Sequence, residues 1–247
     1  AALRPIQDEG KHETASRVLM VVRQVCHHGV ATGRITQDPS ASVRPALTPV
    51  TATHFAAITD PKEIGPFLRK LHGYEGSPVV MSALRLAPLL FVRPGELRKA
   101  KWADIDLDAA EWRFRVSKTG VDHIVPLATQ AVEILTSLHP HTGHQEYVFP
   151  GQRNNGRPMS ENTLAVAMRT MGVAQGTHTI HGWCATARTL LQEQLGYPVH
   201  VIEMQLAHKV RDALGTAYNR TKHLPERKEM MQAWADYLDE LRSETQP

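Results

Sequence analysis

The sequence predicts a mostly α-helical protein with a small antiparallel β-sheet, the α+β class. Apolar residues recur at helical spacing along most of the chain, and helix-start signals stand in front of several of these runs. The period changes at residues 111–116 and 122–127, where side chains alternate. Residues 117–120 between them are Ser-Lys-Thr-Gly, which are typical of turns. Two alternating runs joined in this way indicate a β-hairpin.

The first helix is expected over residues 11–32, with Gly33 suited to the position just past its end. Its apolar residues recur at helical spacing: Val18, Val21, Val22 and Val25. Asp60-Pro61 and Ser77-Pro78 each place a capping side chain before a proline at the first helical position. Helices should follow these pairs, to about residues 71 and 90. Further helices are expected as a short piece from Pro94 and over residues 128–138, 161–171, 178–195, 198–207 and 226–242.

A domain boundary is expected near residue 47. Residues 44–50 contain Pro45 and Pro49 and resemble a linker more than a core element. We therefore assign residues 1–47 to the end of one domain and residues 48–247 to another.

The composition indicates a globular protein. Of the 247 residues, 42% are hydrophobic and 21% are charged, which is enough for a sizeable core. No apolar run approaches the roughly 20 residues of a membrane-spanning helix, and there is no signal-peptide pattern. We expect a soluble, cytoplasmic protein whose two cysteines are reduced thiols. A net charge of +3 permits nucleic-acid binding without arguing strongly for it.

Two groups of residues resemble metal sites. The run Asp104, Asp106 and Asp108 begins like a calcium loop, but Ala109 and Arg115 stand where such a loop needs glycine and glutamate, so we reject it. A zinc set is the second candidate, and its residues are His178, His181, Cys184 and His208. Its spacing matches no zinc pattern, so ordinary helix residues are the better interpretation. A thiol nucleophile at Cys184 with His181 as base lacks a third, orienting group.

Stronger evidence comes from an ordered set of short segments. An arginine lies in Phe-Val-Arg-Pro-Gly-Glu-Leu, a lysine at the hairpin tip, a His-x-x-Cys at a helix start, a histidine at a helix end, and a tyrosine ten residues later. Each of these alone has an ordinary structural explanation, whereas the combination is specific. The residues are Arg93, Lys118, His181, Cys184, His208 and Tyr218.

This ordered set resembles the catalytic domain of tyrosine site-specific recombinases of the phage-integrase kind, over residues 45–242. The resemblance implies the integrase catalytic-domain fold for residues 48–247. It also implies that residues 1–47 are the C-terminal part of the helical core-binding domain that precedes it. The expected activity is cleavage and rejoining of DNA through a 3′-phosphotyrosine intermediate, without a cofactor or metal. The set fits an integrase better than a type IB topoisomerase, which shares the tyrosine chemistry.

The resemblance assigns a role to each residue. Tyr218 attacks the phosphate, and Lys118 donates a proton to the leaving 5′ oxygen. His181 assists proton transfer, His208 hydrogen-bonds the phosphate, and Arg93 grips it with a planar fork of donors. Tyr218 is expected on or beside a short, movable helix.

Cys184 departs from the family pattern, which has a second phosphate-gripping arginine at this position. A thiol supplies neither the charge nor the fork, and losing such a donor costs about 10²–10³ in rate. We therefore expect impaired cleavage. The alternative is a catalytically inactive DNA-binding relative that keeps the fold. Arg188, one helical turn farther on, is a candidate for partial compensation.

The resemblance also implies partners. These are double-stranded DNA carrying attachment sites, DNA-bending accessory proteins, and further copies of the chain in a tetramer on DNA, in the cytoplasm of a bacterial host. The last expected helix has an apolar stripe that either packs on its own domain or docks on a neighbouring subunit. The stripe comprises Met230, Met231, Trp234, Tyr237, Leu238 and Leu241.

Overall fold

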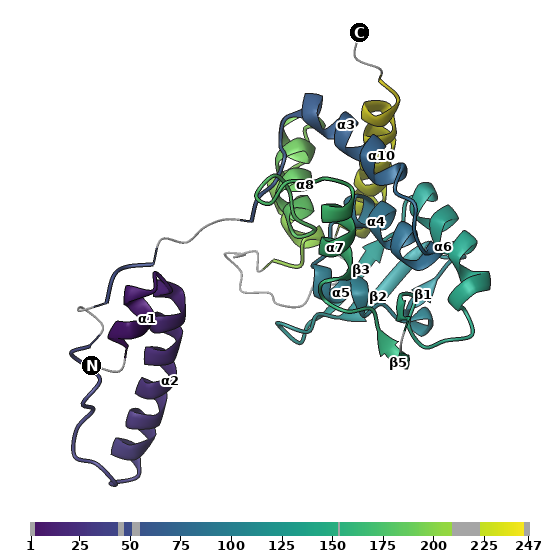
Figure 1. Cartoon of the computed structure of the whole chain (residues 1–247). Coiled ribbons are helices and arrows are strands. Elements are labelled where there is room, and N and C mark those ends of the chain that lie inside the picture. Colours follow the sequence, from purple (N-terminus) through teal and green to yellow (C-terminus); the bar gives the residue numbers. More distant parts are fainter. Residues whose placement is uncertain (1–2, 44–46, 51–54, 153, 209–222, 245–247) are drawn as a thin grey trace. The chain divides into compact units, whose positions relative to one another are not determined.

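The computed structural model describes residues 3–43, 47–50, 55–152, 154–208 and 223–244 (Figure 1). The chain divides into two compact units, residues 1–54 and residues 55–247.

The first unit is helical. It contains α1 (Arg4–Asp8) and α2 (His12–Ala31), so the helix expected over residues 11–32 is confirmed. Gly33 follows with a φ of 69°, a conformation that glycine adopts without a steric penalty. In α2 only Ala15 and Leu19 are buried. The valines that recur at helical spacing are instead 37–66% exposed. They are Val18, Val21, Val22 and Val25.

The second unit is mostly helical with two small antiparallel sheets, as expected for the class. Its α-helices are α3 (Pro61–His72), α4 (Pro78–Leu90), α5 (Pro94–Arg98), α6 (Thr129–Thr142), α7 (Thr163–Thr170), α8 (Gly182–Glu193), α9 (Val199–Gln205) and α10 (Leu224–Ser243). The first sheet has the order β1-β2-β3, from β1 (Ile105–Asp106), β2 (Glu111–Arg115) and β3 (Asp122–Pro126). The second pairs β4 (Pro150–Gly151) with β5 (Asn154–Pro158), and a 3₁₀ turn, η2 (Trp102–Asp104), precedes β1.

The capping signals act as predicted. The Asp60 carboxylate accepts a hydrogen bond from the amide of Lys62 at 2.9 Å, and the Ser77 hydroxyl accepts one from the amide of Val80 at 3.4 Å. These bonds satisfy amide groups that have no partner inside α3 and α4.

One helix start is corrected. We expected a helix over residues 178–195, but α8 begins only at Gly182. The residues before it pair with an extended segment near residue 57. The amide of Thr179 donates to the carbonyl of Ala56 at 3.0 Å, and Nδ1 of His178 accepts from the amide of Ile58 at 3.0 Å. These tertiary bonds replace the helical bonds that residues 178–181 would otherwise form.

The predicted hairpin is confirmed. Strands β2 and β3 pair with Trp112 opposite Val125, and the amide of Gly120 donates to the carbonyl of Val116 at 2.8 Å to close the turn. Gly120 has a φ of 65°, which the turn requires. The aspartate run is a polar turn, in which a carboxylate oxygen of Asp106 accepts from the amide of Ala109 at 2.8 Å.

The core surrounds α4, which packs against α3, α6 and α10 (Figure 1). Trp183 and Trp234 are fully buried, and the indole nitrogen of Trp234 donates to the carbonyl of Pro88 at 2.9 Å. The apolar stripe of α10 therefore packs on its own domain, with Met230, Met231, Trp234, Leu238 and Leu241 at most 8% exposed.

Within the described residues, no helix is both long enough and apolar enough to cross a membrane.

Candidate active site

A sharp turn between α4 and α5 positions Arg93. Phe91 ends α4 in the left-handed region with a φ of 36°, a conformation that costs an ordinary residue about 1–2 kcal/mol. Its ring is buried and contacts Trp234 edge-on, which holds the turn in place. Arg93 then caps α5 in an extended conformation and is half-buried.

The hairpin loop that carries Lys118 is tied to the same segment. Glu96 of α5 is only 7% exposed, and its Oε1 accepts hydrogen bonds from the amide of Ser117 at 3.1 Å and from the Ser117 hydroxyl at 2.8 Å. Lys118 is itself exposed. Because Glu96 lies three residues after Arg93, one carboxylate links the backbone next to Lys118 to the arginine segment.

The charges of three other predicted site residues act on His181. It precedes α8, is half-buried, and packs edge-on against Phe55 with ring centroids 4.4 Å apart. Burial lowers the pKa of His181, and the positive charges of Arg93, His208 and Lys118 lower it further. The charges of Arg93, His208 and Lys118 therefore reach the imidazole, and together with burial they favour its neutral form.

Cys184 follows one turn into α8. Its Sγ donates a hydrogen bond to the carbonyl of Phe91, 3.1 Å away. Burial raises the pKa of the thiol to about 11, although the charge of Arg93 opposes this rise. The thiol is therefore neutral near pH 7, which argues against both a thiolate nucleophile and a thiolate zinc ligand.

His208 lies beyond the end of α9, where Glu203 holds it. One carboxylate oxygen of Glu203 lies 2.6 Å from Nδ1 of His208, and the other accepts from Nε of Arg188 at 2.6 Å. Burial opposes ionisation of Glu203, but the hydrogen bonds from Arg188 and His208 outweigh it and keep the pKa of the carboxyl below its ordinary value. Glu203 is thus an anion that joins Arg188 of α8 to His208, three residues beyond the end of α9.

Arg188 does not stand in for the missing arginine in this arrangement. Its guanidinium is paired with Glu203, whereas the charge that acts on the Cys184 thiol is that of Arg93. The compensation that the helical spacing suggested therefore has no support among the described residues.

His178 is also removed from the chemistry, because it is 4% exposed and its Nδ1 accepts a hydrogen bond from the amide of Ile58.

Arg93, Lys118 and His208 lie within electrostatic range of His181, and Arg93 lies within range of Cys184. Tyr218 and its neighbours, residues 209–222, lie outside the described residues, so the expected helix at Tyr218 is untested.

Sequence reasoning missed the residues that hold this cluster. Arg227 of α10 is 2% exposed and donates to Oε1 of Gln205 from Nε at 3.0 Å and from Nη2 at 2.6 Å. Its Nη2 also donates to the carbonyl of Ile124. Burial lowers the pKa of His123 to about 4, so its neutral ring donates from Nε2 to the carbonyl of Gln205 at 3.0 Å. This buried network joins β3, α9 and α10 immediately before His208.

Comparison with known proteins decides the family. The model of the phage integrase family matches residues 76–223, more than half of the chain, and the model of the phage integrase central domain matches residues 1–46. The chain belongs to the phage integrase family. Among curated integrases, that of Enterobacteria phage P4 is 35% identical over 97% of this chain and 58% of its own length. The chain spans about 60% of the length of the curated relatives that it matches.

Solved integrase structures share the fold. The crystal structure of a lambda integrase(75-356) dimer bound to a COC′ core site has a TM-score of 0.65 at 21% identity, covering 87% of this chain and 79% of that one. A lambda integrase tetramer bound to a Holliday junction has a TM-score of 0.64 at 21% identity, covering 88% of this chain and 64% of that one. The integrase catalytic-domain fold predicted from the sequence is therefore confirmed.

Proposed function

We propose that this integrase-family chain is the catalytic part of a site-specific DNA recombinase in which Cys184 impairs cleavage. The proposal is carried by the phage integrase match over residues 76–223, together with the electrostatic effect of Arg93, Lys118 and His208 on His181. A scissile phosphate at these residues would meet the guanidinium of Arg93 and the donors of Lys118 and His208. Fixed positive donors stabilise the charge that develops on phosphoryl oxygens during transfer.

In the proposed reaction, the phenol oxygen of Tyr218 attacks the phosphorus and the bond to the 5′ oxygen breaks. His181 is neutral and can accept a proton, while Lys118 supplies the proton that the leaving 5′ oxygen needs. The product is a 3′-phosphotyrosine, which conserves the bond energy for religation to a new 5′ hydroxyl. Arg93 and His208 remain on the phosphate throughout. No metal takes part in this scheme.

The second candidate is a DNA-binding relative that no longer cleaves. The specific observation in its favour is that Cys184 presents a neutral thiol, while Arg188 is paired with Glu203. A suicide substrate with a nick beside the scissile phosphate separates the two candidates. A covalent adduct that disappears in Tyr218→Phe supports the recombinase, and DNA binding without any adduct supports the inactive relative.

We further propose the partners and the domain roles. Residues 1–47 would belong to the core-binding domain and residues 48–247 to the catalytic domain. The central-domain match over residues 1–46 and the division of the chain after His54 support this assignment. The chain would bind attachment-site DNA, with DNA-bending accessory proteins, in the cytoplasm of a bacterial host. The DNA-bound dimer and the Holliday-junction tetramer of lambda integrase support DNA binding and assembly.

A homo-tetramer on DNA through the C-terminal helix remains part of the proposal, with one constraint. The apolar stripe of α10 is buried in its own domain, so contact with a neighbour would use exposed polar residues such as Glu229 and Glu240. Deleting α10 would remove Trp234 from the core and is uninformative. Charge reversal of Glu229 and Glu240 to lysine, read by sedimentation of the DNA-bound complex, tests the docking. Unchanged stoichiometry would count against it.

A further inference from the structure

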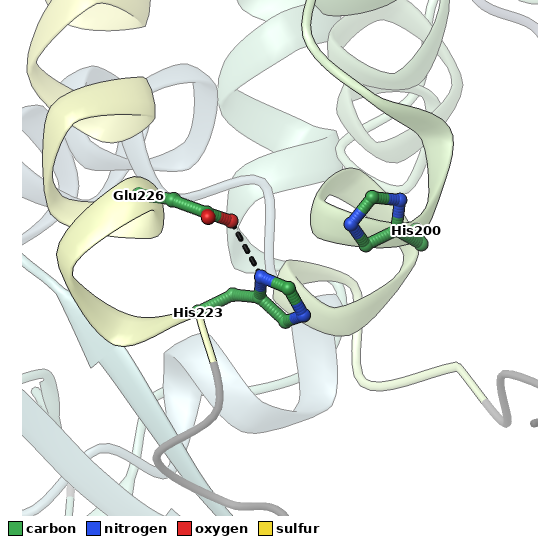
Figure 2. A group of neighbouring side chains, drawn as sticks. All are labelled: His200, His223 and Glu226. Carbon is green, nitrogen blue, oxygen red and sulfur yellow. Dashed lines mark hydrogen bonds and ion pairs between the residues drawn. The ribbon is translucent and has the colours of Figure 1, made fainter.

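Two histidines and a glutamate meet where α9 and α10 begin (Figure 2). His200 is in the first turn of α9, His223 caps α10, and Glu226 is in the first turn of α10. The potential ligand atoms of the three side chains all lie within 4.8 Å of one another. Over the part of the chain that the structure describes, this is the one such group of three.

The hydrogen bonding leaves His200 available. Nδ1 of His223 lies 2.5 Å from a carboxylate oxygen of Glu226, so these two residues are already oriented by each other. His200 contacts them only through its ring, which packs edge-on against His223 with centroids 4.9 Å apart. Among the described residues, no hydrogen bond or ion pair to the ring nitrogens of His200 is seen. A neutral imidazole without such a partner keeps a lone pair for a metal ion.

We propose that His200, His223 and Glu226 bind a divalent transition-metal ion of the zinc class and thereby join α9 to α10. Two imidazole nitrogens and one carboxylate oxygen are a ligand set that Zn²⁺ accepts, with water in the fourth tetrahedral position. On binding, the metal would replace the hydrogen bond between Nδ1 of His223 and Glu226.

The geometry needs only a small adjustment. Zinc bonds to nitrogen and oxygen are about 2.0–2.2 Å long, which puts neighbouring donors in a tetrahedral shell about 3.3–3.5 Å apart. The side chains of His200 and Glu226 are exposed, so rotation about their own bonds can close the present spacing without moving the helices. His200 and His223 are also separate from the group around His181, in which His208 is already paired with Glu203.

The proposed site is independent of the recombination chemistry. It would cross-link residues 200 and 223, and the chain between them includes Tyr218. Closing this loop through a metal stabilises the folded chain in proportion to metal occupancy, because the unfolded chain does not hold the ligands together. The first readouts are therefore metal binding and thermal stability, neither of which requires an active enzyme.

The test uses the whole chain, stripped of metal and titrated with ZnCl₂ against a competing chelator. We expect one Zn²⁺ per chain and a Tm that rises with zinc. His200→Ala and Glu226→Gln should each lower the zinc affinity at least about tenfold, since even groups outside the ligand shell are worth about 10–100-fold. Their Tm values in the presence of EDTA should match that of the unsubstituted chain.

Two controls separate this site from other sources of zinc affinity. His144→Ala removes an exposed histidine elsewhere and should leave the zinc affinity unchanged. Cys184→Ser should also leave it unchanged, and Co²⁺ in place of zinc should give tetrahedral absorption without a thiolate charge-transfer band. Unchanged zinc affinity in both His200→Ala and Glu226→Gln would overturn the proposal. Loss of binding in Cys184→Ser would do so as well.

Discussion

The thiol of Cys184 donates a hydrogen bond to the carbonyl oxygen of Phe91, 3.1 Å away, two residues before Arg93. Phe91 makes the left-handed turn from which the arginine segment departs. The bond therefore places the side chain at position 184 against the backbone that presents Arg93. The charge of Arg93 also reaches the thiol, because it opposes the rise of the Cys184 pKa. In the proposed recombinase, position 184 would hold a second cation, whereas the thiol present there is neutral.

Restoring the cation should restore cleavage. We expect Cys184→Arg to raise the yield of covalent adduct by about 10²–10³, because a preorganised donor at the transferred phosphate contributes about that much. DNA affinity should change little, since it is distributed over many phosphate contacts along the duplex. The measurement is a suicide-substrate assay with Tyr218→Phe as the blank.

Cys184→Ser is the matched control for that prediction. Serine keeps a small hydrogen-bond donor near the Phe91 carbonyl and adds no charge, so its adduct yield should stay near that of the unsubstituted chain. If the cysteine form already cleaves as fast as Cys184→Arg, another cation fills the role and the proposed account of the site is wrong.

Glu203 should act as a positioning residue for His208. In a Cys184→Arg background, where cleavage is measurable, Glu203→Gln removes the charge that pairs with Arg188 and orients the imidazole. We expect the rate of adduct formation to fall by up to about 10², within the range of a proton-transfer or phosphate-binding group, with DNA affinity retained.

Two further variants test whether that effect is local. Glu203→Asp keeps the charge and should recover part of the rate, whereas Glu193→Gln changes an exposed carboxylate of α8 and should have no effect. If Glu203→Gln lowers the folding stability but leaves the rate of adduct formation per folded molecule unchanged, then Glu203 is only structural.

Local signals predicted much of the fold. The caps at Asp60 and Ser77, the turn at Gly120 and the alternation of the hairpin strands depend on neighbours in sequence, and all are confirmed. Strand β1 was missed because two residues cannot display an alternating pattern. The start of α8 was misplaced because its decisive bond joins His178 to Ile58, 120 residues away.

The candidate site, like the fold, could be predicted where the signal is local in sequence and not where it depends on tertiary contacts. Motif order selected Arg93, Lys118 and His208, whose charges act on His181, because each stands in a recognisable segment. The carboxylates that hold them could not be ranked in advance. Nothing local distinguishes Glu203 from any other helical glutamate, and Glu96 lies in the recognised Arg93 segment but carries no local sign of its bonds to Ser117. Arg227 gave a misleading signal. Its charge suggests exposure, but its pairing with Gln205 and the Ile124 carbonyl buries it.

The bond between Glu96 and Ser117 should matter for the lysine. Ser117→Ala removes a 2.8 Å hydrogen bond and is expected to cost about 1 kcal/mol of stability. Cleavage in the Cys184→Arg background should also slow, because the loop that presents Lys118 loses one of its two anchors to α5. Thr119→Ala, in the same exposed loop, is the matched control and should behave like the parent.

A modified substrate shows whether that slowing acts through Lys118. Sulfur in place of the bridging 5′ oxygen leaves as a thiolate, which needs no proton. The deficit of Ser117→Ala should therefore shrink with this substrate. An equal deficit on both substrates would mean that the loop affects DNA placement rather than proton donation.

Acid should destabilise the second unit through buried His123 and His178 and half-buried His72. Burial lowers the pKa of His178 from 6.5 to about 4, and burial is also the largest cause of the lowered values, about 4, of His123 and His72. Between pH 6.5 and about pH 4 these histidines are protonated in the unfolded chain but not in the folded chain. The free energy of unfolding therefore falls as the pH drops through this range. Each histidine contributes a slope of at most about 1.4 kcal/mol per pH unit, which vanishes below about pH 4.

His178→Asn tests this account at one residue. The asparagine side-chain oxygen can accept the hydrogen bond from the amide of Ile58 in place of Nδ1, and it does not titrate. Urea unfolding at a series of pH values should show a shallower loss of stability for His178→Asn, by close to one proton over this range. His144→Gln replaces an exposed histidine and should follow the parent curve. Parallel curves for His178→Asn and the parent would mean that His178 takes up its proton in the folded state.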